Sequence, residues 1–253
     1  MSNSIGFISL TIFALLVLIL FYIVFITKRR ICQTEDNTYL LILIITILTS
    51  ISGLILGICI IQISKIPILI INFLNKIYLS GLLLWGLTLT YYTFHVSKIK
   101  RNIKNPLKLF VMLGSICCLL IFLLPIHNDF IDGQAIVSGL SLQFTFFAIG
   151  IEFLFMIILL IMNIKNINKK YYPIFTLVFL SIINLLIQII FPQLNYLINP
   201  SIAFIIFLMY FTIENPDIKV LNELYKNKTI MEQTYDDKAN FLFEAAQEIK
   251  NPL

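Results

Sequence analysis

Glu152 is the residue whose chemistry is hardest to reconcile with its surroundings, because it falls near the middle of an apolar run over residues 141–162. An ionisable side chain at the centre of a membrane helix costs about 2.5 to 3.5 kcal/mol on the insertion scale, so it needs an explanation. The next apolar run carries three polar residues at i, i+3 and i+7, a spacing that places them on one helical face. These residues are Ser181, Asn184 and Gln188.

Glu152 and Asn184 are predicted to lie at similar depths. Counted from the inner ends of their helices, the two depths differ by about 4.5 Å at 1.5 Å per residue, which is within side-chain reach. One interpretation is an interhelical hydrogen bond that holds the two helices together, with Glu152 protonated. The other is that these residues form part of a ligand-binding or proton-sensing pocket. The sequence leaves both interpretations open.

A second group of polar residues lies in residues 238–253, which read KANFLFEAAQEIKNPL. This segment resembles the H-box of bacterial membrane sensor histidine kinases, in which the phosphorylated His directly precedes a Glu-(Ile/Leu)-(Lys/Arg)-(Asn/Thr)-Pro-Leu run. The match is in register and without a gap at Phe241, Leu242, Ala246, Glu248, Ile249, Lys250, Asn251, Pro252 and Leu253. Gln247 stands where the family has its phosphoacceptor His. Its amide nitrogen gives its lone pair to the carbonyl, so it cannot be the nucleophile that an imidazole provides.

The resemblance implies roles for the neighbouring residues. Glu248 would be the acid or base beside the phosphoacceptor, Asn251 would position water for dephosphorylation, and Pro252 would bend the helix. It also implies a full-length parent that uses ATP and Mg²⁺ and passes phosphate to a response regulator. Within these 253 residues we expect neither the second dimerisation helix nor the ATP-binding domain. We therefore predict no cofactor in this chain, and whether its parent is an active enzyme stays open.

The composition indicates a membrane protein. Apolar residues make up 59% of the chain, charged residues only 12%, and the mean hydropathy is +0.96. Soluble domains have about 45–50% apolar and about 25% charged residues. The net charge of +5 resides mostly in short loops between apolar runs, which excludes a nucleic-acid-binding surface and indicates topology instead. The four cysteines and two histidines show no metal-ligand spacing, so we predict no metal site.

Seven apolar runs predict an all-α, polytopic helix bundle that positions these polar residues. Their approximate bounds are 5–27, 39–63, 77–94, 109–125, 141–162, 172–191 and 197–213. The first run is not a cleavable signal peptide, because its basic triplet, Lys28 to Arg30, follows a long apolar stretch instead of preceding a short one. Gly53 and Gly57 form a Gly-x-x-x-Gly pattern in the second run, which lets another helix approach closely.

The loop charges predict the orientation. With an external N-terminus, the inner loops hold eleven basic residues, at positions 28, 29, 30, 98, 100, 101, 104, 108, 165, 169 and 170. The outer loops hold only Lys65 and Lys76. This bias predicts that the N-terminus is outside and the C-terminal segment cytoplasmic. We therefore expect a multi-pass protein of the bacterial plasma membrane, in contact with lipid.

After the seventh run the sequence becomes polar and predicts a further helix. The residues Glu214, Asn215, Pro216 and Asp217 are typical of a helix start. A heptad seam follows at Leu221, Leu224, Lys228, Met231, Tyr235, Lys238, Leu242, Ala245 and Ile249. Its two lysines make it a weak coiled coil, which predicts a homodimer. The expected organisation is a membrane module over residues 1–213, a signalling helix over 214–237 and the start of a dimerisation helix over 238–253.

The function that combines these features is the input module of a two-component sensor histidine kinase. Its stimulus is not identified by the sequence, but the short outer loops favour a small apolar ligand, a peptide or the bilayer itself. The alternative is a seven-span receptor or transporter-like protein whose C-terminal helix only dimerises. An enzyme acting within the bilayer ranks third, because Glu152 has no partner acid or histidine in its run.

Overall fold

The structure, a computed structural model, describes residues 2–27, 34–62, 65–97, 106–131, 134–163, 174–181, 183, 198–213 and 216–250. Its elements are α1 (Ser2–Thr27), α2 (Thr34–Ile61), α3 (Ile68–Val96), α4 (Pro106–Leu123), β1 (His127–Ile131), β2 (Gln134–Ser138), α5 (Leu140–Met162), α7 (Ile198–Ile213) and α8 (Pro216–Lys250). Residues 174–181 are also helical. Residues 1–213 and 214–253 form two separate compact units.

Five of the described helices, α1 to α5, are long and apolar enough to cross a membrane. α7 is a shorter apolar helix of 16 residues. The prediction of an all-α helical bundle is therefore confirmed, and the length and composition of these five helices suggest a multi-pass membrane protein. The sixth predicted run is described only at residues 174–181 and 183. That the chain crosses the membrane seven times therefore stays a prediction.

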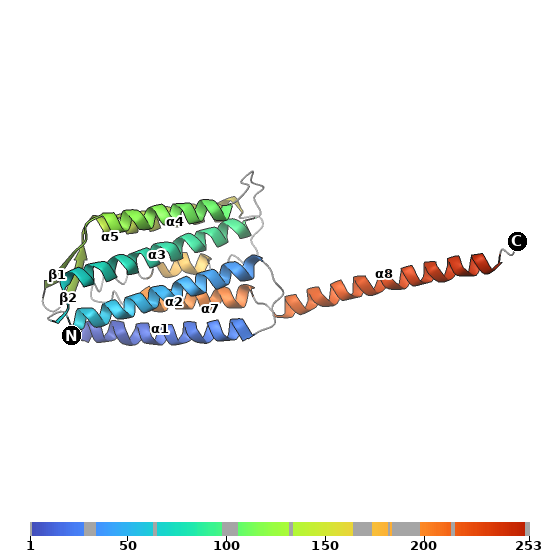
Figure 1. Cartoon of the computed structure of the whole chain (residues 1–253), viewed down its shortest axis with the longest axis horizontal. Coiled ribbons are helices and arrows are strands. Elements are labelled where there is room, and N and C mark those ends of the chain that lie inside the picture. The colour runs from blue at the N-terminus through green and yellow to red at the C-terminus, as the bar shows by residue number, and fades with distance from the viewer. Residues whose placement is uncertain are drawn as a thin grey trace. The chain divides into compact units, whose positions relative to one another are not determined.

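α3 is the central helix of the bundle. It packs against α2, α4 and α5, and α1 packs against α2 and α7. In Figure 1 these helices run side by side, and the start of α1 lies at the same end of the bundle as the β1–β2 hairpin. α3 therefore has neighbours on several sides, and it is well placed to position residues from different parts of the chain.

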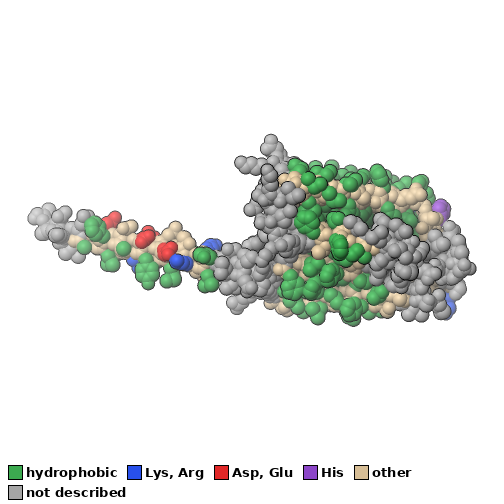
Figure 2. Space-filling model, turned by 180° about the vertical axis from the view of Figure 1, so that it is seen from behind, with side chains coloured by type: hydrophobic (Ala, Val, Ile, Leu, Met, Phe, Trp, Pro, Cys, Tyr) green, Lys and Arg blue, Asp and Glu red, His purple; other side chains and the backbone are tan. Residues whose placement is uncertain are grey.

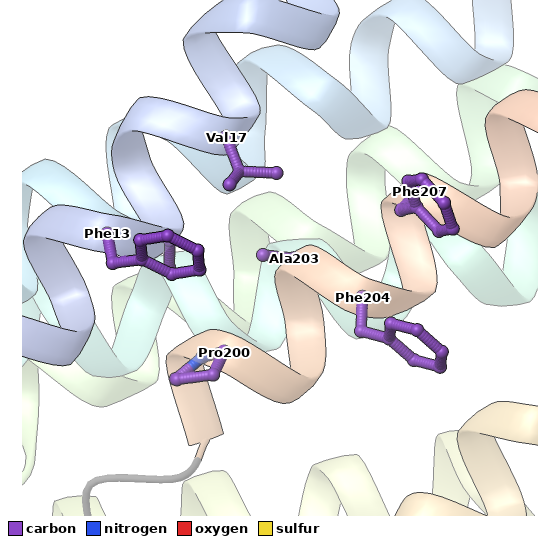
Figure 3. Close-up of a pocket in the computed structure, with 7 residues that line it drawn as sticks. Phe13, Val17, Pro200, Ala203, Phe204 and Phe207 are labelled. Atoms are coloured by element: carbon purple, nitrogen blue, oxygen red, sulfur yellow. The ribbon is translucent and has the colours of Figure 1, made fainter.

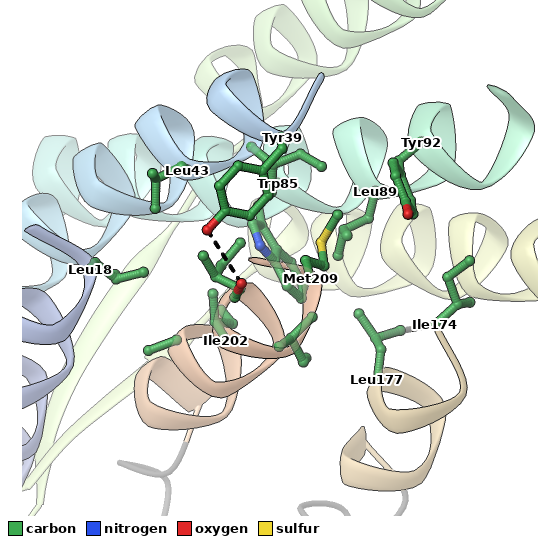
Figure 4. Close-up of a cluster of buried hydrophobic side chains, with 14 of the residues drawn as sticks. Leu18, Tyr39, Leu43, Trp85, Leu89, Tyr92, Ile174, Leu177, Ile202 and Met209 are labelled. Atoms are coloured by element: carbon green, nitrogen blue, oxygen red, sulfur yellow. Dashed lines mark hydrogen bonds between the residues drawn. The ribbon is translucent and has the colours of Figure 1, made fainter. Parts of the chain in front are cut away.

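The main apolar core lies where α1, α2, α3 and α7 meet. Figure 4 shows Leu18, Tyr39, Leu43, Trp85 and Met209 converging from these four helices, and all of them are buried. The Tyr39 hydroxyl donates a hydrogen bond to the Ile206 carbonyl oxygen at 3.4 Å. Many outward-facing side chains are apolar as well, as expected for helices surrounded by lipid, and Figure 2 shows patches of them on the described parts of one face of the bundle.

Several threonine hydroxyls in the described spans are satisfied within their own helices. The Oγ1 atoms of Thr46, Thr90 and Thr145 each donate to the carbonyl oxygen four residues earlier, at 2.7 to 2.9 Å. In a medium without water an unpaired hydroxyl is costly, and this bond removes the cost without a partner helix. These residues can therefore lie at buried positions without forming a functional site.

Two elements differ from the sequence prediction. α3 begins at Ile68, nine residues before the predicted start at residue 77, because the polar side chains in its first turns have partners. The second difference is the antiparallel β1–β2 hairpin between α4 and α5, with His127 paired to Ser138 and Ile131 to Gln134. The bundle is helical as predicted, and the hairpin is an addition to it. Only Asp132 and Gly133 separate the strands, a dipeptide favoured in tight hairpins.

The hairpin returns to α5 through Gly139, whose φ of +119° is a conformation that residues with a side chain rarely adopt. A Cβ at this position would also lie 2.8 Å from the Pro125 carbonyl oxygen. The Ser141 Oγ donates to the Ile121 carbonyl oxygen at 3.1 Å. These contacts fix the start of α5 against the end of α4.

Candidate functional site

Glu152 of α5 is only 7% exposed, and its carboxyl group packs on Gly86 of α3. Its Oε2 atom has no hydrogen-bond partner in the structure as described. The indole Nε1 of Trp85, the residue before Gly86, is likewise buried without a partner. Buried polar atoms normally have hydrogen bonds, so two such atoms contributed by α3 and α5 mark this part of the bundle as unusual.

Gly86 is what makes room for the carboxyl group. It is buried on α3, and the Cβ of any other residue there would overlap Glu152 Oε2. The Gly86 carbonyl oxygen also accepts a hydrogen bond from Thr90 Oγ1 at 2.9 Å. The Glu152 carboxyl group therefore contacts the backbone of α3 at Gly86.

Of the three predicted polar partners of Glu152, only Ser181 is among the described residues. The Ser181 Oγ donates to the Leu177 carbonyl oxygen of its own helix at 2.8 Å. Asn184 and Gln188 lie outside the described residues, so an interhelical bond from either of them stays a prediction. The contact that the structure does describe is with Gly86.

Sequence reasoning missed Gly86, although a signal for it exists. Gly86 lies ten residues before the end of α3, and Glu152 lies ten residues before the end of α5. The signal is therefore a small residue at the same depth as the buried acid, because small residues let membrane helices approach closely.

A second set of buried polar residues, the Asn199 cluster, joins three helices. Asn199 of α7 donates through Nδ2 to Thr11 Oγ1 of α1 at 3.0 Å. Its Oδ1 accepts from the Tyr78 hydroxyl of α3 at 3.3 Å. Gly53 of α2 lies beside the Tyr78 ring, since a Cβ there would be 2.9 Å from ring atom Cε2. Asn199 is a polar residue within an apolar run, and its amide is hydrogen-bonded to two neighbouring helices.

Three asparagines form a clasp between the hairpin and α3. Asn75 Nδ2 donates to Asn128 Oδ1 at 2.6 Å, and Asn128 Nδ2 donates to Asn72 Oδ1. Next to them, the Lys76 ammonium donates to the Phe122 carbonyl oxygen at 2.8 Å, near the C-terminal end of α4. A cation is favourable there, because the last carbonyl groups of a helix carry partial negative charge. These bonds explain why α3 extends beyond its predicted start.

An apolar pocket of about 250 Å³ lies between α1 and α7. Figure 3 shows its lining, which consists of Phe13, Ala14, Val17, Pro200, Ala203, Phe204 and Phe207. None of these side chains can form a hydrogen bond. The pocket is therefore suited to an apolar group such as a lipid acyl chain, and it offers no polar recognition.

The predicted signalling segment and most of the H-box match lie on one helix, α8. Its backbone is helical from Pro216 to Lys250 and includes Gln247 and Glu248, whereas Asn251 lies outside the described residues. Four seam positions have large apolar side chains that are 59 to 68% exposed: Leu224, Met231, Tyr235 and Leu242. Figure 2 shows hydrophobic side chains along α8, with acidic ones mostly on the opposite edge.

The electrostatics of α8 add little to its stability. Lys228 and Glu232 form an i,i+4 ion pair at 3.7 Å with both side chains well exposed. Exposed helical pairs contribute about 0.3–0.5 kcal/mol. Burial of the apolar seam would contribute more, but the single chain leaves the seam uncovered.

No family model matches the chain, and no curated protein matches it significantly. The resemblance of residues 238–253 to a histidine kinase H-box therefore rests on the residues of that segment.

Proposed function

We propose that the chain is the membrane input module of a bacterial two-component sensor histidine kinase. The observation that carries this proposal is the ungapped match of residues 241–253 to the H-box, with Gln247 at the phosphoacceptor position. The helical course of α8 supports it, because the signalling segment and the start of the H-box lie on one helix without a break. A continuous helix can pass a shift or rotation at one end to the other.

The proposed topology has seven spans, an external N-terminus and a cytoplasmic α8. Its support is the excess of basic residues in the loops assigned to the inside, eleven against two. Such an orientation would place the H-box segment in the cytoplasm, where ATP is found. The proposed location is the bacterial plasma membrane, with lipid covering the outward-facing apolar side chains of the bundle.

A second copy of the chain is the proposed partner of α8. The helix has 35 residues and is about 52 Å long at 1.5 Å per residue, enough for five heptads. Its exposed apolar seam would be buried in a parallel dimer. Lys228 and Lys238 on the seam would keep that dimer weak, which suits a helix pair that changes its arrangement when a signal arrives.

The chemistry of the proposed parent would involve groups outside this chain. ATP and Mg²⁺ would be bound by an ATP-binding domain, and a response regulator would receive the phosphate. Glu248 would act beside the phosphoacceptor and Asn251 would position water. With Gln at position 247 this site accepts no phosphate, so the module would act through the conformation of its dimer.

Cysteine cross-linking of the full chain in membranes tests the dimer of α8. In a background with all four native cysteines replaced by alanine, Met231→Cys places a thiol on the seam. Asn240→Cys is the matched control, because the heptad register places it furthest from the seam. Mild oxidation should yield a disulfide-linked dimer from Met231→Cys and little from Asn240→Cys. Equal yields at both positions, or none at either, would contradict a seam dimer.

A dimer alone does not distinguish the kinase input from a receptor whose C-terminal helix only dimerises. The gene region that follows codon 253 separates the two. An ATP-binding domain encoded there supports the kinase proposal. Its absence there would favour the receptor.

A further inference from the structure

Glu152 is the one acid of the described bundle that is buried with a carboxyl oxygen, Oε2, that has no hydrogen-bond partner. The Asn199 cluster and the asparagine clasp satisfy their polar atoms internally, so they have structural explanations. Nothing of this kind explains Glu152. The carboxyl group lies against the backbone of Gly86.

No basic side chain of the described helices is near enough to pair with Glu152. Along the bundle helices the residues of type Asp, Glu, Lys or Arg are Glu35, Asp36, Lys76, Lys108 and Glu152. Lys76 is ten residues from Gly86 on α3, about 15 Å along the helix, and it is engaged with the end of α4. Lys108 is nine residues from Cys117 on α4, about 13 Å away along that helix.

The remaining ionisable groups of the described helices do not provide a counter-charge beside Glu152. On α4, the Cys117 thiol is close enough to interact electrostatically with the carboxyl group. On α3, the ionisable groups besides Lys76 are Tyr78, Tyr91, Tyr92 and His95, each at least five residues from Gly86. Neither the rest of α5 nor the helical residues 174–181 carry an acid or a base. A carboxylate would thus have no described counter-charge, and an isolated buried carboxylate is strongly unfavourable.

We propose that Glu152 is a protonation switch in the bundle: as the neutral acid it packs on Gly86 and holds α5 against α3, and as the carboxylate it leaves this contact. In the switching step the carboxyl O–H bond breaks, its electron pair stays on the oxygen, and a water molecule that reaches the group takes the proton. The reverse step restores the contact. The switch goes beyond the proposed function, because it concerns the bundle alone and needs no phosphate transfer.

The switch predicts how stability depends on pH. The neutral acid can keep the contact with Gly86 and an uncompensated carboxylate cannot, so ionisation of Glu152 should destabilise the bundle and stability should fall as the pH is raised. Glu152→Gln keeps the shape of a neutral acid but cannot lose a proton. The thermal unfolding midpoint of the wild type should therefore fall with rising pH relative to that of Glu152→Gln, whereas the two should be closest at acidic pH. Comparing the two proteins removes the contribution of every other titrating group.

Infrared spectroscopy of the full chain in lipid provides the second measurement. The carbonyl band of a protonated carboxylic acid should be present at neutral pH, be absent from Glu152→Gln, and disappear as the pH is raised. If Glu152→Gln fails to fold, Glu152→Met, of similar volume and also without a charge, takes its place. Parallel pH profiles of the wild type and the neutral variant would overturn the switch. So would a wild-type spectrum without this band at neutral pH.

Discussion

The carboxyl group of Glu152 in α5 occupies the space beside Gly86 of α3 that a side chain at residue 86 would need. The Glu152 carboxyl group fits into the space that Gly86 leaves open at the interface between α5 and α3. Small residues that let helices approach are common in membrane bundles, but here the approaching group is an ionisable side chain. This match determines how closely α5 can pack on α3.

Gly86→Ala should destabilise the bundle, because its methyl group would overlap the Glu152 carboxyl. Overpacking of this kind typically costs about 1–3 kcal/mol. Gly150→Ala is the matched control on α5, since no atom lies within 4 Å of a Cβ built there. That change should be neutral or stabilise by up to about 1 kcal/mol, because it favours the helix. Chemical or thermal unfolding in the same detergent measures both.

The cause of the Gly86 effect can be isolated with a double variant. If the methyl group acts through the carboxyl, then Gly86→Ala should cost much less in a Glu152→Ala background, where the space is vacant. The two substitutions should therefore be non-additive by about 0.5–3 kcal/mol. Additive effects would show that residue 86 and residue 152 do not compete for the same space.

Asn199→Leu should destabilise the bundle by about 1–3 kcal/mol, because it removes the bonds to Thr11 and Tyr78 and leaves their hydroxyls with fewer partners. A double-mutant cycle with Thr11→Val measures the part due to that pair. Ser9→Ala, on the same helix as Thr11, is the control. Its exposed hydroxyl bonds only to the Gly6 carbonyl oxygen, so its loss should change stability by less than about 0.5 kcal/mol. A coupling energy near zero in the cycle would mean that the Asn199–Thr11 bond does not stabilise the bundle.

The orientation is tested by labelling from outside the cell. In the cysteine-free background, a cysteine at Asp129 in β1 should react with an impermeant thiol reagent, and one at Asn168 should react only after the membrane is opened. The physical reason is the excess of basic residues in the loop that contains Asn168. Opposite labelling would reverse the topology and remove the support for a cytoplasmic H-box segment.

The sequence predicted the helices well where composition alone decides the structure. The ends of α4 and α5 lie within three residues of the predicted bounds, because long and almost entirely apolar runs leave little choice in a membrane. The start of α3 was misplaced by nine residues, because Asn72, Asn75 and Lys76 were assigned to a loop. Their partners, Asn128 and the Phe122 carbonyl, come from a distant part of the chain, so no local sequence pattern predicts these contacts.

The candidate site was predicted only in part. The burial of Glu152 in a span followed from its position, and Gly53 and Gly57 do lie against other helices, at Tyr78 of α3 and Phe7 of α1. The contact of Glu152 with Gly86 was not predicted, because only polar partners were expected. The predicted bonds to Asn184 or Gln188 lie outside the described residues and stay predictions. Which side chains of two helices face each other depends on the rotation of both helices about their axes. Sequence spacing gives the face within one helix but not the face of its neighbour.

Phosphotransfer at position 247 tests the central claim most directly. The natural gene product that contains these residues, and its Gln247→His variant, are each incubated with radiolabelled ATP and Mg²⁺. The products are then tested for acid-labile phosphate. Gln and His are both polar and similar in reach, so the substitution should change stability by no more than about 0.5 kcal/mol. The account predicts acid-labile label on Gln247→His and none on the wild type, because only the imidazole is a nucleophile. Equal labelling of both proteins, or no label on either despite confirmed ATP binding, would contradict the assignment of Gln247 as a replaced phosphoacceptor.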